Sequence, residues 1–431
     1  MNNQITKELI DFIHKSPSTF HVVKNMSDEL EKEGFELLNI QDEWNLKKGG
    51  KYFTTINDSA LFAFIIGTGN PETEGFRIIS AHSDSPSFKL KPTPEMTVEN
   101  HFIKLNTEVY GGPIFMTWLD RPLSIAGRVS LKSDNPFAPQ NRFININRPT
   151  VIIPTIAYHM NRTVNDGVAL NAQKDMLPLI GIVSKECQSK DFVIRLIAKE
   201  LDVNESEILD FDLTLYEFQP GCIMGVNNEF VSCPKLDNLE SVHAGLKAIL
   251  DAVPGKATQM LAIFDNEEVG SVTKQGAGSP VFKHLFERIL LQLGKSGEAF
   301  YRTVYKSFMI SADMAHSLHP NQTDKHDPVL HPVINGGPVI KIHANQKYTT
   351  DGNSGAVFES ICKKAGVPYQ KFVNRSDIIG GSTLGNVSTG QLEINCVDVG
   401  NPILGMHSVR ELGGADDHEY MIKAMTCFYN I

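Results

Sequence analysis

The chain has 431 residues, of which 41% are hydrophobic and 21% are charged, and its formal net charge at pH 7 is −10. This composition is that of a globular protein, and the length favours two or three domains with a sizeable core. The acidic balance and the lack of basic runs argue against a protein that binds nucleic acid or anionic membranes.

The N-terminal region is predicted to begin with two amphipathic helices. One covers residues 6–15, and the second covers residues 19–33 after the turn signal Ser16-Pro17-Ser18. The start of the chain therefore differs from a signal peptide, and no apolar stretch reaches membrane-spanning length. Six cysteines lie without CxxC spacing, which is typical of a reducing compartment. We expect a cytoplasmic protein with no membrane contact.

The character of the chain changes twice. Two prolines one residue apart, Pro92 and Pro94, indicate a boundary, so residues 1–94 are expected to form the first part of a domain that resumes after an insertion. Residues 95–232 contain short strand-like runs such as 123–131 and 150–153, which predict an inserted β-rich domain. In residues 233–431 strands and helices alternate up to a helix at 419–428. This pattern predicts an α/β fold with a mostly parallel central sheet.

Several apolar runs of the α/β part end on polar residues. Strand ends and helix starts of this kind place their side chains at one edge of an open α/β sheet, where ligands bind. We therefore expect six residues, distant in sequence, to converge: His82, Asp237, Glu267, Glu268, Asp313 and His407.

Taken singly, each of these residues has another explanation. Asp237 precedes a helix predicted for residues 238–251 and is also a suitable N-cap. His407 precedes Ser408-Val409-Arg410-Glu411, which fits a capping box, and the Glu267–Glu268 pair resembles a solvated acidic loop. Together, however, imidazole and carboxylate groups form a mixed ligand set. That set suits Zn²⁺, with Mn²⁺ or Co²⁺ as substitutes, better than Ca²⁺ or Mg²⁺.

Charge counting favours two metal ions. Two divalent ions carry four positive charges, three ligand carboxylates return three negative charges, and a bridging hydroxide would neutralise the site. In this scheme Asp237 bridges both ions, His82 and Asp313 complete one site, and Glu268 and His407 complete the other.

Two further residues receive roles in this scheme. Asp84, two residues after His82, is expected to accept the second N–H of the imidazole and fix its tautomer. Glu267 is left as general base for the bridging water, because neighbouring residues of a strand point to opposite faces and Glu267 therefore diverges from Glu268.

The motifs around these residues resemble the aspartyl aminopeptidase family, which includes the vacuolar aminopeptidase I type. The similarity extends along the whole chain and includes Trp118-Leu119-Asp120-Arg121-Pro122. The other matching segments are residues 81–86, 236–238, 265–271, 311–316 with 319–321, and 405–411.

The resemblance implies a dinuclear zinc exopeptidase that removes N-terminal residues from peptides. It also implies a phosphorylase-like αβα catalytic domain, an inserted dimerisation domain, and dimers that assemble into a tetrahedral dodecamer. The metal roles given above agree with the family's roles at the matching positions.

The resemblance also implies a role for His159 in the insert. The segment 154–162 is similar to a family segment whose histidine reaches into the active site of a neighbouring subunit and stabilises the oxyanion. Without the resemblance, His159 would be interpreted as a packed, hydrogen-bonded histidine.

Substrate preference is less constrained. A preference for N-terminal Asp or Glu requires a cationic group in the specificity pocket. The family's substrate-binding stretches correspond here to Lys341, Lys347 and Arg375, and to a turn with Gly381, Ser382 and Thr383. Acid-preferring members carry a lysine where this chain has Asn345, so an acidic preference and a broad or neutral (leucine-type) preference both remain open.

Two other functions are compatible with a metal site of this kind. One is a metal-stabilised assembly or cargo-binding protein without turnover, which would have no need for a free base such as Glu267. The other is a related dinuclear deacylase or carboxypeptidase, against which only the long motif match argues.

Overall fold

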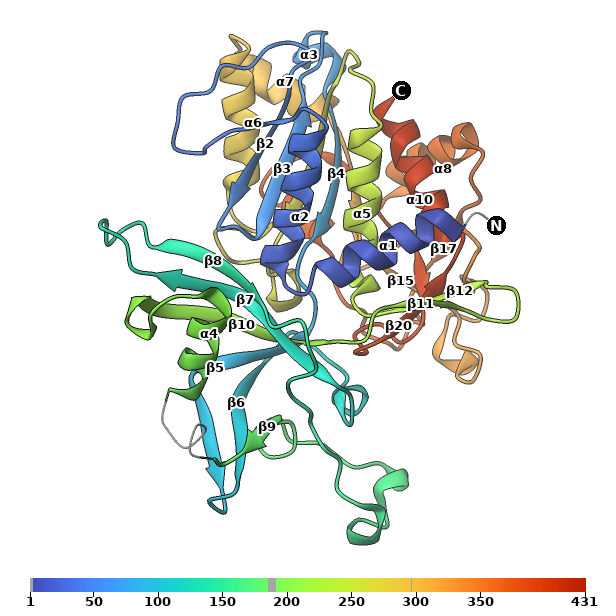
Figure 1. Cartoon of the computed structure of the whole chain (residues 1–431). Coiled ribbons are helices and arrows are strands. Elements are labelled where there is room, and N and C mark those ends of the chain that lie inside the picture. The colour runs from blue at the N-terminus through green and yellow to red at the C-terminus, as the bar shows by residue number, and fades with distance from the viewer. Residues whose placement is uncertain (1–2, 185–190, 296) are drawn as a thin grey trace.

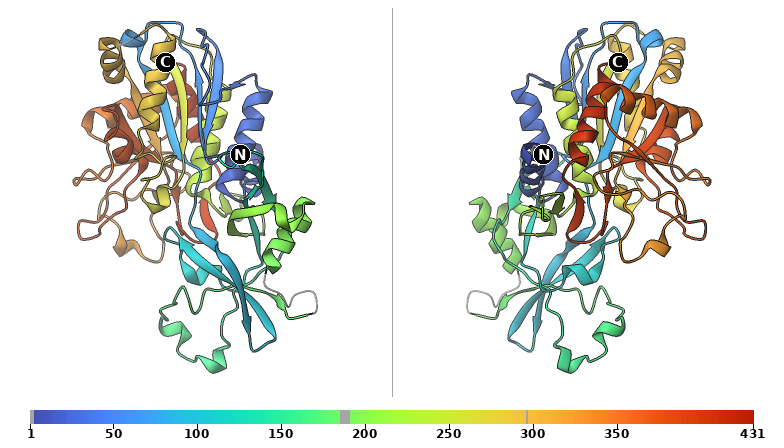
Figure 2. Two further views of the ribbon diagram at one scale, coloured as in Figure 1. Left: turned by 90° about the vertical axis from the view of Figure 1, so that its left-hand side faces the viewer. Right: turned by 90° about the vertical axis from the view of Figure 1, so that its right-hand side faces the viewer.

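The computed structural model describes residues 3–184, 191–295 and 297–431. Within these residues a large sheet lies between two layers of helices, and a second sheet projects from one end of this αβα body (Figure 1, Figure 2). The predicted α/β fold is confirmed.

The large sheet is mostly parallel at its centre. β13 pairs in parallel with β4, β4 with β14, and β14 with β18, whereas the β2–β3, β3–β13 and β18–β16 pairs are antiparallel. In spatial order its described strands are β1 (Glu36–Leu37), β2 (Lys51–Ile56), β3 (Ala60–Ile65), β13 (Thr258–Phe264), β4 (Phe76–His82), β14 (Phe308–Ala312), β18 (Asn395–Gly400), β16 (Val339–Lys341) and β17 (Gln370–Phe372).

Helices on both faces explain why the central strands are mostly apolar on both sides. In β13, Leu261 and Ile263 face one core, whereas Met260, Ala262 and Phe264 face the other. The first core is covered by α1 (Asn3–Lys15), α2 (Thr19–Lys32), α5 (Leu236–Leu250), α8 (Gly352–Ala365) and α10 (Asp417–Tyr429). The second is covered by α6 (Val281–Gln292), α7 (Glu298–Lys306) and α9 (Leu384–Thr389), and the short α3 (Pro71–Glu74) precedes β4. The helices predicted at both ends of the chain and after Asp237 are confirmed.

The second sheet is antiparallel and has its own apolar core. Its described strands, in spatial order, are β8 (Gln140–Asn145), β7 (Leu123–Leu131), β10 (Ile208–Glu217), β5 (Ser87–Val98), β6 (Phe102–Tyr110) and β9 (Leu179–Ile182), and α4 (Phe192–Leu201) packs beside them. We refer to this sheet and its connections as the insert. The expected strand at 150–153 is reduced to isolated bridges, because its successive residues pair with three different segments.

The predicted boundary after residue 94 falls inside β5. Pairing between β5 and β6 is irregular between Leu90 and Glu95, the interval that contains Pro92 and Pro94. Proline has no backbone N–H to donate, so the prolines disturb the ladder without ending the strand. The division into residues 1–94, 95–232 and 233–431 stays a prediction.

Two small sheets complete the strand pairings of the described residues. One contains β11 (Cys222–Met224), β12 (Phe230–Cys233) and β20 (Glu411–Gly414), and the other pairs β15 (Ala315–His316) with β19 (Pro402–Ile403). In the described part of the chain no helix has the length and apolar character needed to cross a membrane.

Candidate metal centre

Three neighbouring strands of the large sheet bring polar residues to one edge. β13, β4 and β14 are adjacent and parallel, so their carboxyl ends lie together. His82 is the last residue of β4, and Asp313 follows β14 directly. Asp237 lies at the start of α5, where its backbone angles are not helical, and its side chain points towards the same edge.

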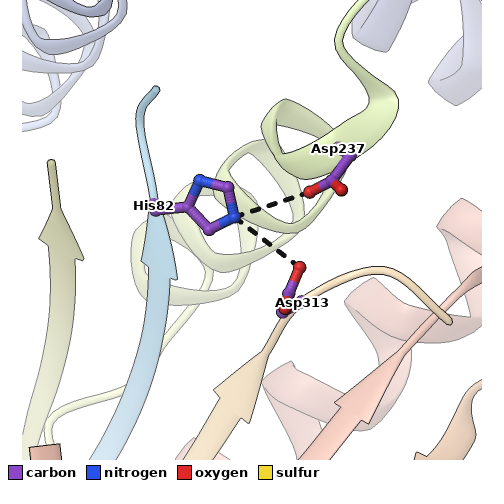
Figure 3. Close-up of side chains that lie close together, drawn as sticks. All are labelled: His82, Asp237 and Asp313. Carbon is purple, nitrogen blue, oxygen red and sulfur yellow. Dashed lines mark ion pairs between the residues drawn. The ribbon is translucent and has the colours of Figure 1, made fainter. Parts of the chain in front are cut away.

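His82 faces two carboxylates (Figure 3). Its Nε2 atom lies 3.5 Å from Asp237 Oδ1 and 3.6 Å from Asp313 Oδ1. The other ring nitrogen, Nδ1, lies 3.1 Å from the backbone oxygen of Asp84 and 3.3 Å from its Oδ1. An Nδ1–H that donates to Asp84 leaves Nε2 unprotonated, as a metal ligand must be.

The other oxygen of Asp237 faces a second histidine. Asp237 Oδ2 lies 3.6 Å from His407 Nε2, and Glu268 Oε2 lies 3.5 Å from the same nitrogen. His407 Nδ1 lies 3.1 Å from the carbonyl oxygen of Gly112. The Asp237 carboxylate therefore lies between two groups, each with one histidine and one further carboxylate.

These separations fit metal ligands better than hydrogen bonds. They exceed the usual N–H···O distance of about 2.9 Å. Tetrahedral coordination with bonds of about 2.0 Å places neighbouring ligand atoms about 3.3 Å apart. In addition, Asp237 Oδ1 and Glu268 Oε1 are buried without a hydrogen-bond partner among the described residues. Imidazole nitrogens and carboxylate oxygens in this arrangement suit zinc or a similar first-row ion.

The cluster also contains an excess of buried negative charge. Burial lowers the pKa of His82, but its contacts with carboxylates, first Asp237, outweigh burial and raise this pKa well above its usual value. The same balance raises the pKa of His407 to about 10. Burial, reinforced by the charge of Asp237, raises the pKa of Glu268. All three shifts favour added positive charge, which divalent ions would supply.

The two glutamates occupy a turn and not a strand. β13 ends at Phe264, and Glu267–Val269 form the 3₁₀ helix η5. The predicted strand alternation at Glu267 and Glu268 is therefore wrong. Successive residues of a 3₁₀ helix point about 120° apart, and in this turn one carboxylate oxygen of Glu267 still lies within 4.8 Å of one of Glu268. Asn266 begins the turn with φ of 63°, a left-handed conformation that asparagine tolerates.

Asp84 holds this turn in place. Its Oδ1 accepts from Glu267 N at 3.1 Å, its Oδ2 accepts from Glu268 N at 3.2 Å, and Tyr110 Oη donates to Oδ2 at 2.6 Å. Asp84 was predicted only to accept from the imidazole of His82. Because β4 ends at His82, Asp84 lies in the following turn, where its carbonyl oxygen and Oδ1 both face the imidazole and its carboxylate also accepts from the backbone of both glutamates.

Glu267 lies beside the cluster with a free carboxylate. One of its oxygens is within 4.8 Å of ligand atoms of His82 and Glu268. Within the described residues this carboxylate has no hydrogen bond or ion pair. Burial raises the pKa of Glu267 to about 8, an effect that the charge of His82 opposes and that of Asp313 reinforces. Such a group is suited to accept a proton.

Glu411 is a site residue that the sequence analysis missed. Its Oε1 accepts from His407 N at 2.8 Å, and its Oε2 accepts from Asp237 N at 2.9 Å. One buried carboxylate thus fixes the backbone at two candidate ligands. The sequence places Glu411 only in a capping-box pattern, yet it begins a strand, β20, and no helix starts there.

A cavity of about 320 Å³ opens next to His407, at Gly405 and Met406. Gly381 lines this cavity, and Ser382 is exposed in the same turn. Thr383 is buried, and its hydroxyl donates to Asp398 Oδ1 at 2.7 Å.

The two lysines predicted to bind substrate form hydrogen bonds or ion pairs with other residues of the chain. Lys341 Nζ lies 3.4 Å from Asp313 Oδ2 and donates to the carbonyl of Met314 at 3.1 Å. Lys347 Nζ donates to the carbonyl of Gly380 at 2.8 Å. Their roles towards substrate stay predictions.

His159 is not part of this cluster in its own chain. It lies in the exposed 3₁₀ helix η2 (Tyr158–Met160). The surrounding segment 154–170 lies at the far end of the insert, away from the large sheet (Figure 1, Figure 2).

Comparison with known proteins gives the class of the chain. Residues 12–429 match the family model described as aminopeptidase I zinc metalloprotease (M18). The chain is 52% identical to a probable M18 family aminopeptidase 2 of Clostridium novyi (strain NT), over 100% of both chains. It also matches a chain of the Ape4 and Nbr1 complex at a TM-score of 0.94, with 34% identity over 99% of this chain and 85% of that chain.

A chain of the mApe1 dodecamer of S. cerevisiae matches at a TM-score of 0.87, with 27% identity over 99% of this chain and 96% of that chain. The chain therefore belongs to the aminopeptidase I (M18) family of zinc metalloproteases. Membership of this family confirms the expected activity, that of a metal-dependent aminopeptidase.

Glu411→Gln is expected to weaken zinc binding by about 10–100-fold, the usual effect of removing a group that orients a ligand. A glutamine amide has one acceptor oxygen, so its NH₂ group would face one of the two backbone N–H donors. Zinc competition with a chromogenic chelator measures the change, and Glu393→Gln, at an exposed position, is the control. Equal zinc affinity in both variants would contradict the role of Glu411.

Proposed function

We propose that this chain hydrolyses the N-terminal peptide bond of peptides and that the cluster holds two zinc ions. The arrangement of Asp237, with its two oxygens facing different histidines, carries this proposal. His82 and Asp313 would complete one ion, and Glu268 and His407 the other. Manganese or cobalt could replace zinc, because selectivity among first-row ions at such ligands is modest.

Glu267 is the general base in this proposal. Bound zinc would polarise the scissile carbonyl and lower the pKa of the attacking water. The Glu267 carboxylate then takes a proton from that water and passes it to the leaving amine. Asp84 keeps Glu267 at this place through its hydrogen bond to the backbone N–H.

We further propose a preference for N-terminal Asp or Glu. The cavity beside His407 is lined by His316, His319, Lys325 and Arg375, and none of its described lining residues is acidic. Arg375 is paired with Asp377, whereas Lys325 has no ion pair in the described part of the chain. A substrate carboxylate in this cavity would meet a free ammonium group. The alternative is a broad or neutral preference.

The working form in this proposal is a homo-oligomer, with dimers that assemble into a tetrahedral dodecamer. The related mApe1 of S. cerevisiae is described as a dodecamer. In the insert, Ile156, Tyr158 and Met160 are 55%, 54% and 75% exposed, and a cavity of about 540 Å³ lies beside them. Exposed apolar groups of this kind mark protein contacts. His159 would then enter the site of a neighbouring subunit and stabilise the oxyanion.

We place the protein in the cytoplasm. The described cysteines are all free, and Cys187 lies outside the described residues. Free cysteines are typical of a reducing compartment.

Glu267→Gln is expected to keep two zinc ions per chain and to lose turnover by about 10²–10⁴-fold, because the positioned base is removed and no ligand is. Elemental mass spectrometry and hydrolysis of a fluorogenic peptide measure the two quantities. Glu268→Gln is the comparison and should lose metal. Wild-type turnover in Glu267→Gln, or metal loss equal to that of Glu268→Gln, would refute the base assignment. One zinc ion per wild-type chain would refute the dinuclear site.

Aminoacyl fluorogenic substrates test the acidic preference. Wild-type enzyme should show higher kcat/KM for Asp and Glu than for Leu. Lys325→Gln should lower kcat/KM for Asp by roughly 10–100-fold, the effect of losing a hydrogen bond to a charged group worth about 1.5–3 kcal/mol, and should leave Leu unchanged. A wild-type enzyme that prefers Leu would support the neutral alternative instead.

Mixing two inactive variants tests the role of His159. His159→Ala and Glu267→Gln chains should each be inactive alone, and mixed oligomers should recover part of the activity. In a mixed oligomer some sites receive an intact carboxylate from one chain and an intact imidazole from another. Native mass spectrometry confirms mixing. Mixed oligomers without activity would mean that His159 does not act across subunits.

A further inference from the structure

The loop that carries His407 is held by the insert. This His407 loop (residues 405–411) connects β19 with β20, yet its backbone is bonded to residues that follow β6. Ile114 N donates to the carbonyl of His407 at 3.0 Å, and Val409 N donates to Thr117 Oγ1 at 2.9 Å. The contact between His407 Nδ1 and the carbonyl of Gly112 belongs to the same set.

Two side chains of the His407 loop reach further into the insert. Val409 is buried in the apolar core of the insert. Arg410 Nε and Nη2 each lie 3.0 Å from Glu217 Oε2. Glu217 is the last residue of β10, its side chain is 0% exposed, and its Oε1 also lies 2.7 Å from Arg121 Nη1. A buried carboxylate shared by two guanidinium groups fixes their relative positions strictly, because loss of one partner leaves an unpaired buried charge.

The backbone of His407 needs such support. Its φ is 68°, in the left-handed region that residues with a side chain rarely adopt. Backbone angles of this kind persist only where the surroundings hold them. If the loop relaxed, Nε2 of His407 would move away from Asp237 and Glu268.

We propose that the insert positions His407 for metal binding and that the Glu217–Arg410 ion pair is the contact on which this depends. The proposal rests on the proposed dinuclear site. Neither Glu217 nor Arg410 contacts the cluster, so both are positioning residues. The insert thus contributes to the metal site within its own chain, independently of its role in assembly.

Glu217→Gln tests the proposal on the complete protein. The change keeps the size of the side chain and removes its charge. Competition with a chromogenic chelator should show two zinc ions in wild type, and in the variant one ion of wild-type affinity and one bound about 10–100-fold more weakly. His407→Ala should lose the same ion. Asp212→Asn is the control, because Asp212 also lies on β10 and pairs with an arginine, Arg128, without contact to the His407 loop; both its ions should bind as in wild type.

Hydrogen exchange in metal-free protein gives a readout that does not depend on zinc. Backbone amides of the His407 loop should exchange faster in Glu217→Gln than in wild type, while those of α5 stay unchanged. A milder matched pair is Thr117→Val, which removes the acceptor of Val409 N, and Thr117→Ser, which keeps it. If Glu217→Gln gives little folded oligomer, the Thr117 pair decides the question.

The outcomes separate this proposal from the proposed function. Two zinc ions of wild-type affinity in Glu217→Gln, or unchanged exchange in the His407 loop, would overturn the positioning role. Equal weakening of both ions would also overturn it, because that result indicates general destabilisation. A wild-type chain with fewer than two zinc ions would overturn the dinuclear site, and the exchange measurement would then decide the positioning role alone.

Discussion

Buried negative charge at the edge of the large sheet is the constraint on which the site depends. Asp237, Glu268 and Asp313 lie together with two imidazoles, and the ammonium group of Lys341 lies 3.4 Å from Asp313 Oδ2. Carboxylates in such surroundings are costly unless positive charge is supplied. Since the candidate ligands come from β4, from α5 and from segments that follow β13, β14 and β19, an ion at this place would tie these elements together.

The part of the site that could be predicted follows from strand ends. β13, β4 and β14 are mostly apolar because helices cover both faces, so a His or Asp that closes such a run marks the end of the strand. His82 and Asp313 stand at such ends. Asp237 stands at the start of a helix, and the helical pattern of the residues after it marks that start in the sequence. Because neighbouring strands of the sheet run parallel, the polar residues at their carboxyl ends must lie close together, and this conclusion needs no knowledge of side-chain contacts.

The residues that support the ligands could not be predicted in this way. Glu411 accepts from the backbone of two residues, one of them 174 positions away in sequence, and nothing in periodicity records such a contact. For Glu267 and Glu268 the local structure was mistaken, because the chain leaves β13 before them and the left-handed Asn266 starts a turn. Hydrogen bonds to backbone N–H groups depend on how the chain folds in three dimensions, so they produce no regular spacing of residues in the sequence.

The insert shows that the rule of strand ends holds for the second sheet as well. β6 ends at Tyr110, whose hydroxyl binds Asp84, and β10 ends at Glu217, which binds Arg410 of the His407 loop. The carboxyl ends of strands from both sheets therefore contact segments of the candidate metal centre. The family resemblance implies a dimerisation domain for the insert and gives these two residues no role. One antiparallel sheet thus contacts both Asp84, which accepts from the backbone of Glu267 and Glu268, and the His407 loop, so it links segments of the candidate centre that are distant in sequence.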